Sequence, residues 1–269
     1  MNVVCIGAHP DDCEVFAGGT ALKWVARGAR VLFVSLTNGA IGHFEQFGAE
    51  LARRRRREAE ESASRSGVET RVLDYPDGEL EPSLKLRKEV VDLIRRWEAD
   101  IVLTHRPNDY HPDHRYTSIV VQDAAFMVTV PGYCLQAPRR PSNPIFAYFQ
   151  DFFEKPAPFL PDIVVGIDEV MEGKWAMLDA MESQFYEWLP WLDGKLDEVP
   201  NDPESRLAWL KESWTPFFYE ATRRVKGSLR KWYGPRRAER IRFAEAFEIC
   251  EYGRRPSDDE IRNVFPMSL

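Results

Sequence analysis

The stretch Asn2-Val3-Val4-Cys5-Ile6-Gly7, which runs directly into Ala8-His9-Pro10-Asp11-Asp12, decides the fold. Its first part is an apolar run rich in β-branched residues, as expected of a strand that is buried on both faces in a parallel sheet. The second part is a polar turn that follows this strand without a gap. Open parallel sheets bind their ligands at the carboxyl ends of their strands, so the turn marks a candidate functional site.

Outward from this stretch, apolar runs alternate with segments that carry charge at helical spacing. The apolar runs predict strands, and the charged segments predict helices. The strands are expected at residues 30–36, 70–73 and 101–104, and the helices at residues 20–27, 49–66 and 84–98, with Gly18-Gly19-Thr20 supplying the start of the first helix. This alternation predicts an α/β fold with a mostly parallel sheet and helices on both faces.

The chain changes character after Val130. Closely spaced prolines between residues 131 and 161 break it into loops, which we interpret as a lid or rim, around a strand at residues 145–149. A further strand is expected at residues 163–167 and a helix from residue 168 to about 188. We expect one domain over residues 1–269, with a core of about residues 1–185 and a Pro- and aromatic-rich C-terminal elaboration or lid over residues 186–269.

The C-terminal part is rich in aromatic residues, which gather between residues 188 and 219. An aromatic cluster of this kind more often packs in a core than binds a ligand, although the rims of sugar sites do use Trp and Tyr. We therefore expect packing to be its main role.

Bulk composition limits the classes of function. With 269 residues, 44% of them hydrophobic, the chain can bury a large core. Its formal net charge of −7 argues against a nucleic-acid partner, because phosphate binding needs a basic face. No apolar run approaches the ~20 residues that cross a bilayer, no basic leader is present, and the cysteines are far apart. We predict a cytoplasmic protein that acts on a small molecule and contacts neither membrane nor nucleic acid.

The turn Ala8-His9-Pro10-Asp11-Asp12 places one imidazole and two carboxylates close together. Both groups ligate zinc and other divalent ions, and Pro10 stiffens the turn so that His9 and Asp12 can converge. Adjacent aspartates repel each other unless a cation or distinct roles separate them. One division makes Asp12 a ligand and leaves Asp11 as the catalytic base. Taken alone, a polar turn that caps the next helix explains these residues better.

A second polar segment, Asn108-Asp109-Tyr110-His111-Pro112-Asp113-His114, follows the strand at residues 101–104. Of the five histidines in the chain, those at positions 105, 111 and 114 lie in this connection and one lies in the first turn. Two such clusters at the same edge of one sheet favour a metal site over isolated core histidines. We expect His114 to be the third ligand, because two His and one Asp leave positions open for water and substrate.

The remaining histidines have separate expected roles. His111 would lie beside the metal as a proton-transfer group, with Asp113 or Asp109 orienting its ring. His105 is expected to be structural or to support a ligand. His43, in the loop after the second strand, is expected to line the substrate pocket.

With both motifs in place, the chain resembles the PIG-L/LmbE-like zinc-dependent N-deacetylases, which act on N-acetylglucosaminyl compounds. The paired motifs are highly specific, and the resemblance spans at least the first 185 residues. It rests on His9-Pro10-Asp11-Asp12, Thr37-Asn38-Gly39, Arg55 with Glu58, Tyr75-Pro76-Asp77-Gly78, His111-Pro112-Asp113-His114, and residues 161–165 and 174–184.

The resemblance implies a Rossmann-like fold and a role for each motif residue. His9, Asp12 and His114 would ligate zinc or another divalent metal. Asp11 would be the general base, and His111 with Asp113 would stabilise and protonate the tetrahedral intermediate. Relatives are often oligomeric, which predicts a homo-oligomer. The candidate substrate-binding residues are Arg55, Asn38, His43 and Asp109.

Two features complicate the match. Many relatives have histidine where this chain has Met181, so any role of that histidine is missing here. The run Arg53–Arg57 suggests nucleic-acid binding, but five helical residues sweep about 500° at about 100° each and cannot form one basic face. At least one of them must point inward. The resemblance assigns this position to Arg55, which would hold a substrate oxygen or pair with an acidic residue.

The function expected from these residues is metal-dependent hydrolysis that removes an acetyl group from an N-acetylglucosamine-type sugar or conjugate. Three alternatives remain open. An amidase could cleave a larger acyl group or a thiol conjugate with the same site. Two His and one carboxylate also describe Fe(II) oxygenases, although the α/β pattern and Asp11 favour hydrolysis. Met181 leaves room for a catalytically impaired metal- or sugar-binding protein.

Overall fold

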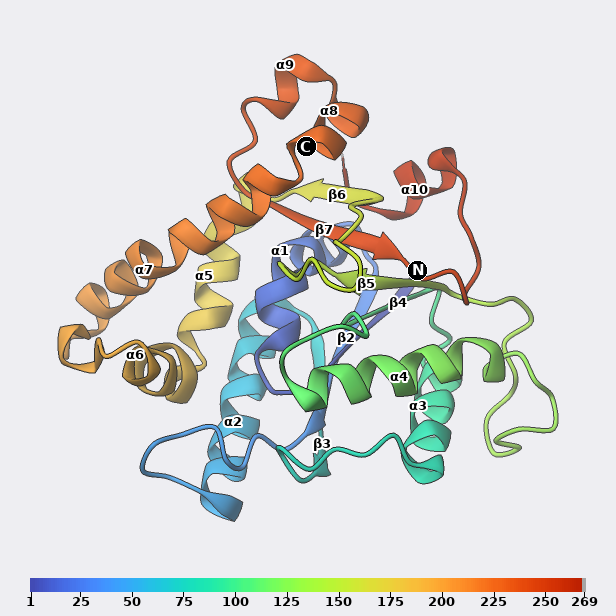
Figure 1. Ribbon diagram of the computed structural model, residues 1–269, viewed down its shortest axis with the longest axis horizontal. Coiled ribbons are helices and arrows are strands. Elements are labelled where there is room, and N and C mark those ends of the chain that lie inside the picture. Colours follow the sequence, from blue (N-terminus) through green and yellow to red (C-terminus); the bar gives the residue numbers. More distant parts are fainter. Residues whose placement is uncertain (268–269) are drawn as a thin grey trace.

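The computed structural model describes residues 1–267, which form one central sheet with helices packed against it (Figure 1). The elements of the first part are β1 (Asn2–Gly7), α1 (Asp12–Ala26), β2 (Arg30–Thr37), α2 (Gly48–Ser66), β3 (Glu69–Tyr75), α3 (Leu84–Arg96), β4 (Ile101–Thr104), α4 (Pro112–Met127), β5 (Ile145–Phe149) and β6 (Ile163–Gly166). Those of the second part are η1 (Asp168–Val170), α5 (Met171–Asp179), η2 (Ser183–Trp188), α6 (Leu189–Leu192), η3 (Leu196–Glu198), α7 (Pro203–Arg224), α8 (Lys226–Tyr233), α9 (Pro235–Ala238), β7 (Ala244–Ile249) and α10 (Asp258–Val264).

The strands lie in the order β3-β2-β1-β4-β5-β7-β6. Strands β1 to β5 pair in parallel, whereas β7 runs antiparallel to both β5 and β6. The predicted mostly parallel α/β sheet is confirmed. The chain proceeds from β1 to β2 on one side and from β4 to β5 on the other, so the connections after β1 and β4 diverge at the carboxyl ends. A ligand crevice is expected at this point.

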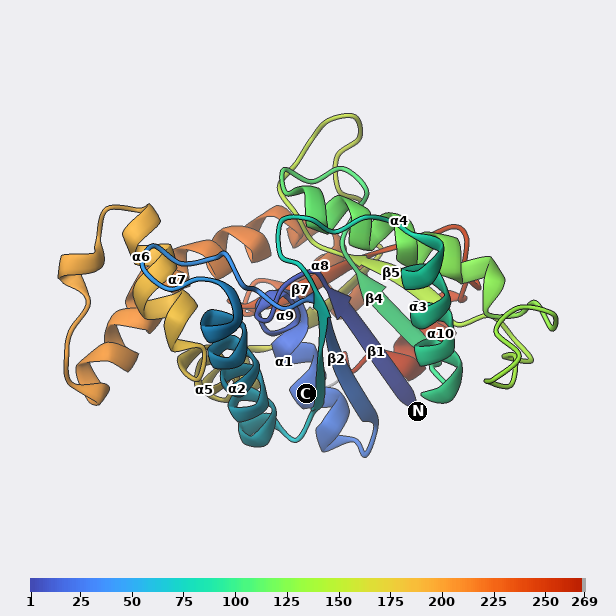
Figure 2. The ribbon, with the colours of Figure 1, turned by 90° about the horizontal axis from the view of Figure 1, so that it is seen from below.

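Two apolar layers attach the helices to the sheet (Figure 2). Helices α1, α2 and α5 cover one face, where Val3 and Cys5 of β1 are buried. Helices α3 and α4 cover the other face, over Val4 and Ile6. Neighbouring residues of a strand point to opposite faces, so one continuous apolar run serves both layers.

The first helix begins at Asp12 and not at residue 20, so the prediction of its start was wrong. Gly19 lies inside α1 because the helix packs closely here: a Cβ on Gly19 would lie 2.8 Å from Ile167 Cδ1. The amides of Gly19 and Thr20 also donate to the carboxylate of Glu245, at 2.9 Å and 2.7 Å. Glu245 of β7 thus accepts hydrogen bonds from amides in the middle of α1. Capping residues normally do this at the first turn of a helix.

The segment after β6 also differs from the prediction. One helix was expected over residues 168–188, but the chain forms η1, α5 and η2, the last with π-helical geometry. Strand β7 was not predicted, because its sequence Ala244-Glu245-Ala246-Phe247-Glu248-Ile249 carries two acidic residues. Since β7 lies between β5 and β6, residues after 185 complete the sheet as well as extending the fold. Within residues 1–267, no helix is both long enough and apolar enough to cross a membrane.

Candidate active site

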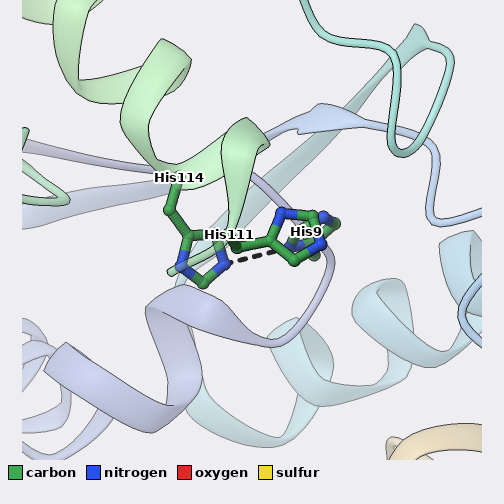
Figure 3. A group of neighbouring side chains, drawn as sticks. All are labelled: His9, His111 and His114. Carbon is green, nitrogen blue, oxygen red and sulfur yellow. Dashed lines mark hydrogen bonds between the residues drawn. The ribbon is translucent and has the colours of Figure 1, made fainter. Parts of the chain in front are cut away.

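Connections after three parallel strands bring polar side chains to one place. His9 follows β1, Asp77 follows β3, and His114 lies in the first turn of α4, after β4. His111 is the N-cap of α4, and its Nδ1 accepts a hydrogen bond from the amide of Asp113 at 3.2 Å. The rings of the three histidines face one another (Figure 3).

His9, Asp12 and His114 form a compact triangle of side chains that can ligate a metal, in which each carboxylate oxygen of Asp12 faces one of the two histidines. Nδ1 of His9 lies 3.2 Å from Nε2 of His114 and 3.6 Å from Oδ2 of Asp12. Oδ1 of Asp12 lies 3.4 Å from Nε2 of His114. Ligand atoms about 2.0–2.2 Å from a tetrahedral zinc ion are themselves about 3.3–3.5 Å apart. The three observed distances are close to this spacing, so the three side chains can converge on one divalent ion.

The second ring nitrogen of each of these histidines faces a carboxylate. Nε2 of His9 lies 3.1 Å from Oδ1 of Asp77 and 3.4 Å from Oδ2 of Asp113. Nδ1 of His114 lies 3.1 Å from Oδ2 of Asp109. These close contacts lack the angles of good hydrogen bonds and are mainly electrostatic. Carboxylates at such positions orient metal-binding histidines and fix which nitrogen carries the proton.

The pKa shifts of His9 and His114 indicate whether the surroundings of the two rings favour positive charge. Burial lowers the pKa of both histidines, but the surrounding carboxylates outweigh it. Asp113, Asp12 and Asp77 raise the pKa of His9 well above its usual value. Asp12 and Asp109 raise the pKa of His114 to about 9. The carboxylates thus draw positive charge to the ring nitrogens, and a divalent cation between those nitrogens would supply the same charge.

Two further histidines lie beside the triangle, and each belongs to a group whose ligand atoms lie close enough to hold an ion: His9 with His111 and His114, and Asp12 with His105 and His114. His105 Nε2 lies 3.1 Å from Asp12 Oδ2, and its ring stacks on His114 with centroids 4.0 Å apart. The amide nitrogen of Ala8 lies 3.2 Å from the same Nε2, and the tautomer of the ring decides whether Nε2 accepts from Ala8 or donates to Asp12. The Nδ1 lone pair of His111 accepts from the Asp113 amide, so the proton of the neutral His111 ring lies on Nε2. His105 therefore packs beside Asp12 and His114, while His111 offers an N–H donor.

Asp11 lies between Pro10 and the ligand-type Asp12, in a strained backbone conformation with φ of 152°. Its Oδ2 accepts a hydrogen bond from Nη2 of Arg55 at 3.0 Å, and the same nitrogen donates to the carbonyl of Pro10 at 2.9 Å. Burial raises the pKa of Asp11 to about 6, although Arg55 opposes this rise. A carboxyl group with such a pKa can both accept and release a proton near neutral pH.

A cavity of about 620 Å³ opens beside these groups. Its wall includes His9, Asp11, Asp12, Arg55, Asp77, Asp109, His111 and His114. Arg55 is the inward-pointing residue of the arginine run, with 3% of its surface exposed, and it pairs with an acidic residue, Asp11.

Two residues predicted to bind substrate lie outside this cavity wall. Asn38 holds its loop by donating to Asp74 Oδ1 at 3.1 Å and accepting from the Ala40 amide at 3.1 Å. Nε2 of His43 lies 2.7 Å from Glu187, and its Nδ1 accepts from two backbone amides. The polar atoms of Asn38 and His43 fix the loop after β2, so a role of either residue in substrate binding stays a prediction.

Asp113 and Asp109 also have partners that differ from the expected ones. The buried carboxylate of Asp113 accepts from the amides of Gly78 at 2.7 Å and Leu80 at 3.2 Å and contacts His9. Asp113 was expected to orient the His111 ring, but its carboxylate contacts the His9 ring instead. Asp109 accepts from the His111 amide at 2.9 Å and faces the His114 ring.

The sequence analysis did not identify Asp77 as a partner of His9, nor Gln184 as a residue of the cavity wall. The only sequence feature that pointed to Asp77 was its place in a polar turn after a strand. Met181 is buried in the core, away from the cavity wall. Gln184 from the same segment lines the cavity and donates to the Gly42 carbonyl at 3.1 Å.

Comparisons with known proteins agree with this geometry. The model of the PIG-L family, described as GlcNAc-PI de-N-acetylase, matches residues 4–125. The diacetylchitobiose deacetylase of Thermococcus kodakarensis is 34% identical over 202 residues, which cover 71% of this chain and 74% of that protein.

Solved structures extend the likeness over nearly the whole chain. The N,N'-diacetylchitobiose deacetylase from Pyrococcus horikoshii is 28% identical with a TM-score of 0.69, over 93% of this chain and 84% of that one. The 4-carboxy-2-hydroxymuconate hydratase from Pseudomonas putida KT2440 shares the fold, at 21% identity and a TM-score of 0.71 over 96% and 98% of the two chains. The two motifs, the fold and these matches agree, and the chain belongs to the PIG-L family.

Proposed function

We propose that this protein hydrolyses the amide of an N-acetylglucosamine-type sugar or conjugate, so that water and the amide give acetate and a free amine. The observation that carries this proposal is the triangle of His9, Asp12 and His114, with edges of 3.2–3.6 Å, beside Asp11 and an open cavity. The family description, GlcNAc-PI de-N-acetylase, and the name of the Thermococcus relative support the same reaction.

His9, Asp12 and His114 are proposed to hold a divalent ion, with zinc as the first candidate. A set of two histidines and one carboxylate suits zinc and leaves coordination positions open. When bound, the ion would polarise the acetyl carbonyl and favour ionisation of water. Asp77 and Asp109 would keep the two imidazoles in the orientation that the ion requires.

The proton transfers are assigned to residues of the cavity wall. Asp11, held by Arg55, takes the proton of the attacking water and then passes it to the leaving nitrogen, which suits a pKa of about 6. His111 donates from Nε2 to the carbonyl oxygen as negative charge develops there. Burial and the neighbouring His9 and His114 lower the pKa of His111, so it acts as a neutral donor, a contribution of about 3–4 kcal/mol in comparable sites.

The experiment is release of free amine from N-acetylglucosamine, its methyl glycoside and N,N'-diacetylchitobiose by the metal-loaded protein, beside Asp11→Asn. We expect the variant to lose about 10²- to 10⁴-fold in rate while binding the same amount of metal. Wild-type turnover that Asp11→Asn leaves intact would remove Asp11 from the mechanism. A metal-loaded wild type that releases no amine from any of these compounds, nor from longer alkyl glycosides of N-acetylglucosamine, would refute the deacetylase function.

We further propose that residues 1–269 act as one domain, in the cytoplasm, on a small molecule and as a homo-oligomer. The single-domain organisation is supported by β7, which lies in the central sheet although it follows residue 185. Sedimentation velocity of the metal-loaded protein would test the oligomeric state.

A further inference from the structure

The wall of the cavity at the candidate site combines charged and polar groups with a large apolar surface. The charged and polar groups include Arg55, Asp77 and His111. Most of the apolar wall comes from three separate parts of the chain: the connection after β5, the segment of η2 and α6, and helix α7. Helix α7 packs against η2, and α6 continues η2 directly along the chain. The side chains of this apolar wall include Phe152, Phe153, Phe185, Leu192, Trp214 and Phe217.

Four of these aromatic side chains are joined by ring contacts into one continuous surface. The ring of Phe185 packs against Trp214 with centroids 4.9 Å apart, and Trp214 packs against Phe217 at 5.4 Å. Phe217 in turn contacts Phe152 at 5.4 Å. Contacts of this kind hold the rings in place without a ligand, so the apolar wall is preformed.

Two polar side chains of the connection after β5, Gln150 and Asp151, line the cavity and are already paired within the protein. Gln150 donates to the carbonyl of Ala221 at 2.9 Å. Asp151 accepts from Nη1 of Arg106 at 2.9 Å. A second sugar unit placed here would lose hydrogen bonds between its hydroxyls and water and find few partners, which is costly. An apolar group would gain from the same environment.

We propose that the apolar wall binds an alkyl or aryl group attached to the sugar, so that the substrate is an apolar glycoside of an N-acetylated amino sugar. This inference rests on the proposed function, which fixes the acyl group as acetyl. Because acetyl is small, the rest of a 620 Å³ cavity must accept the other end of the substrate. The preference would separate this chain from relatives whose names specify a disaccharide.

The test compares four amino-sugar amides that differ in the group attached to the sugar or in the acyl group. They are the methyl and n-hexyl glycosides of N-acetylglucosamine, N,N'-diacetylchitobiose, and methyl glucosaminide carrying an N-hexanoyl group. We expect the hexyl glycoside to exceed both the methyl glycoside and the disaccharide in kcat/KM by at least tenfold, since each buried methylene can contribute about fourfold.

Leu192 offers a variant that preserves the fold, because it lines the cavity while 55% of its surface is exposed. Leu192→Asn should reduce the ratio of hexyl to methyl kcat/KM by about threefold or more. Leu135→Asn is the matched control, since Leu135 is 79% exposed and lies outside the cavity wall. That control should keep the wild-type ratio.

Binding provides a readout that is independent of turnover. Trp188 and Trp214 line the cavity, so their fluorescence should change on titration with the hexyl glycoside, with a Kd at least tenfold below that of the methyl glycoside. Tighter hexyl binding without amine release would support the apolar site and refute the deacetylase function. Turnover of the methyl and hexyl glycosides at equal kcat/KM would overturn this inference and leave the function standing. A higher kcat/KM for the N-hexanoyl compound alone would show that the apolar wall binds the acyl group. That result would also overturn this inference.

Discussion

Asp77 shows how one residue outside both histidine motifs can decide the chemistry of the site. Its Oδ1 lies 3.1 Å from Nε2 of His9, on the opposite side of the ring from the atom that faces His114. A carboxylate there makes the imidazole a better ligand and fixes its tautomer. The affinity for metal should therefore depend on a residue that does not touch the ion.

We expect Asp77→Asn to weaken zinc binding by about 10- to 100-fold, measured by competition with a chromophoric chelator. Asparagine keeps an oxygen that can accept from the Ile41 amide, as Asp77 does at 3.2 Å, so the turn should survive. Asp74→Asn is the control, because Asp74 is exposed and bonds to Asn38. Equal affinities in the two variants would show that Asp77 does not support the ligand.

Glu14 is a buried carboxyl group on α1, beneath the site, and its desolvation raises its pKa to about 8. The unfolded chain ionises Glu14 near pH 4.5, while the folded, metal-free chain keeps it protonated. The folded state therefore binds the extra proton, and its stability falls as pH rises from about 4.5 toward 8.

The consequence is that Glu14→Gln should be more stable than the wild type at pH 7 but not at pH 4.5. The gap in the free energy of unfolding should grow with pH by up to about 1.4 kcal/mol per unit. Urea unfolding of the metal-free proteins at several pH values measures it, with exposed Glu60→Gln as control. A gap that stays constant with pH would mean that Glu14 is ionised in the folded state.

At the scale of elements, helix α1 depends on a buried ion pair from two distant parts of the chain. Nζ of Lys174 on α5 lies 2.6 Å from Glu245 Oε1 on β7, and it also donates to the Val15 carbonyl at 2.6 Å. Glu245 accepts from the amides of Gly19 and Thr20. The pair thus joins α1 to α5 and β7 through backbone groups of the helix.

Removing one partner would leave the other charge buried without compensation. We expect Glu245→Ala to lower the free energy of unfolding by about 3–5 kcal/mol, measured by urea denaturation. Glu239→Ala, which removes the exposed partner of Arg230, should change stability little. Similar losses in both variants would mean that the Lys174–Glu245 pair does not anchor α1.

This ion pair also explains which elements could be predicted from the sequence. Strands β1, β2, β4 and β5 were predicted with at most one residue of error, because they are continuous apolar runs buried on both faces. The start of α1 and the whole of β7 were missed for one reason: Glu245 is charged yet buried, and its partners Lys174, Gly19 and Thr20 are distant in sequence. Local patterns carry no information on such partners.

The same limit applied to the site. The histidine and aspartate motifs predicted which residues converge, since they directly follow strands of one sheet edge. Hydrogen-bond partners were predicted less well. Asp113 faces His9 and Asp109 faces His114. His43 contacts the carboxylate of Glu187. These pairings depend on how loops pack against each other, which spacing alone does not determine.

At the scale of the whole molecule, the triangle of ligand-type atoms joins segments that meet only in the folded state. His9 and Asp12 lie after β1, and His114 lies after β4, so unfolding separates them. An ion that binds the folded state alone stabilises it by about 2.7 kcal/mol when its free concentration is 100 times Kd. Since ~1 kcal/mol shifts Tm by about 2–4 °C in chains of comparable size, zinc should raise Tm by roughly 5–10 °C over the chelated protein.

The His114→Ala variant separates this site from ions bound elsewhere. It removes one corner of the triangle while Asp12 and His9 remain, so zinc should raise its Tm far less than it raises that of the wild type. An equal rise in both proteins would place the stabilising ion outside the triangle and contradict the proposed ligands. A rise confined to the wild type, together with loss of amine release in the variant, would show that the ion holding the two sheet connections together is also the one the reaction requires.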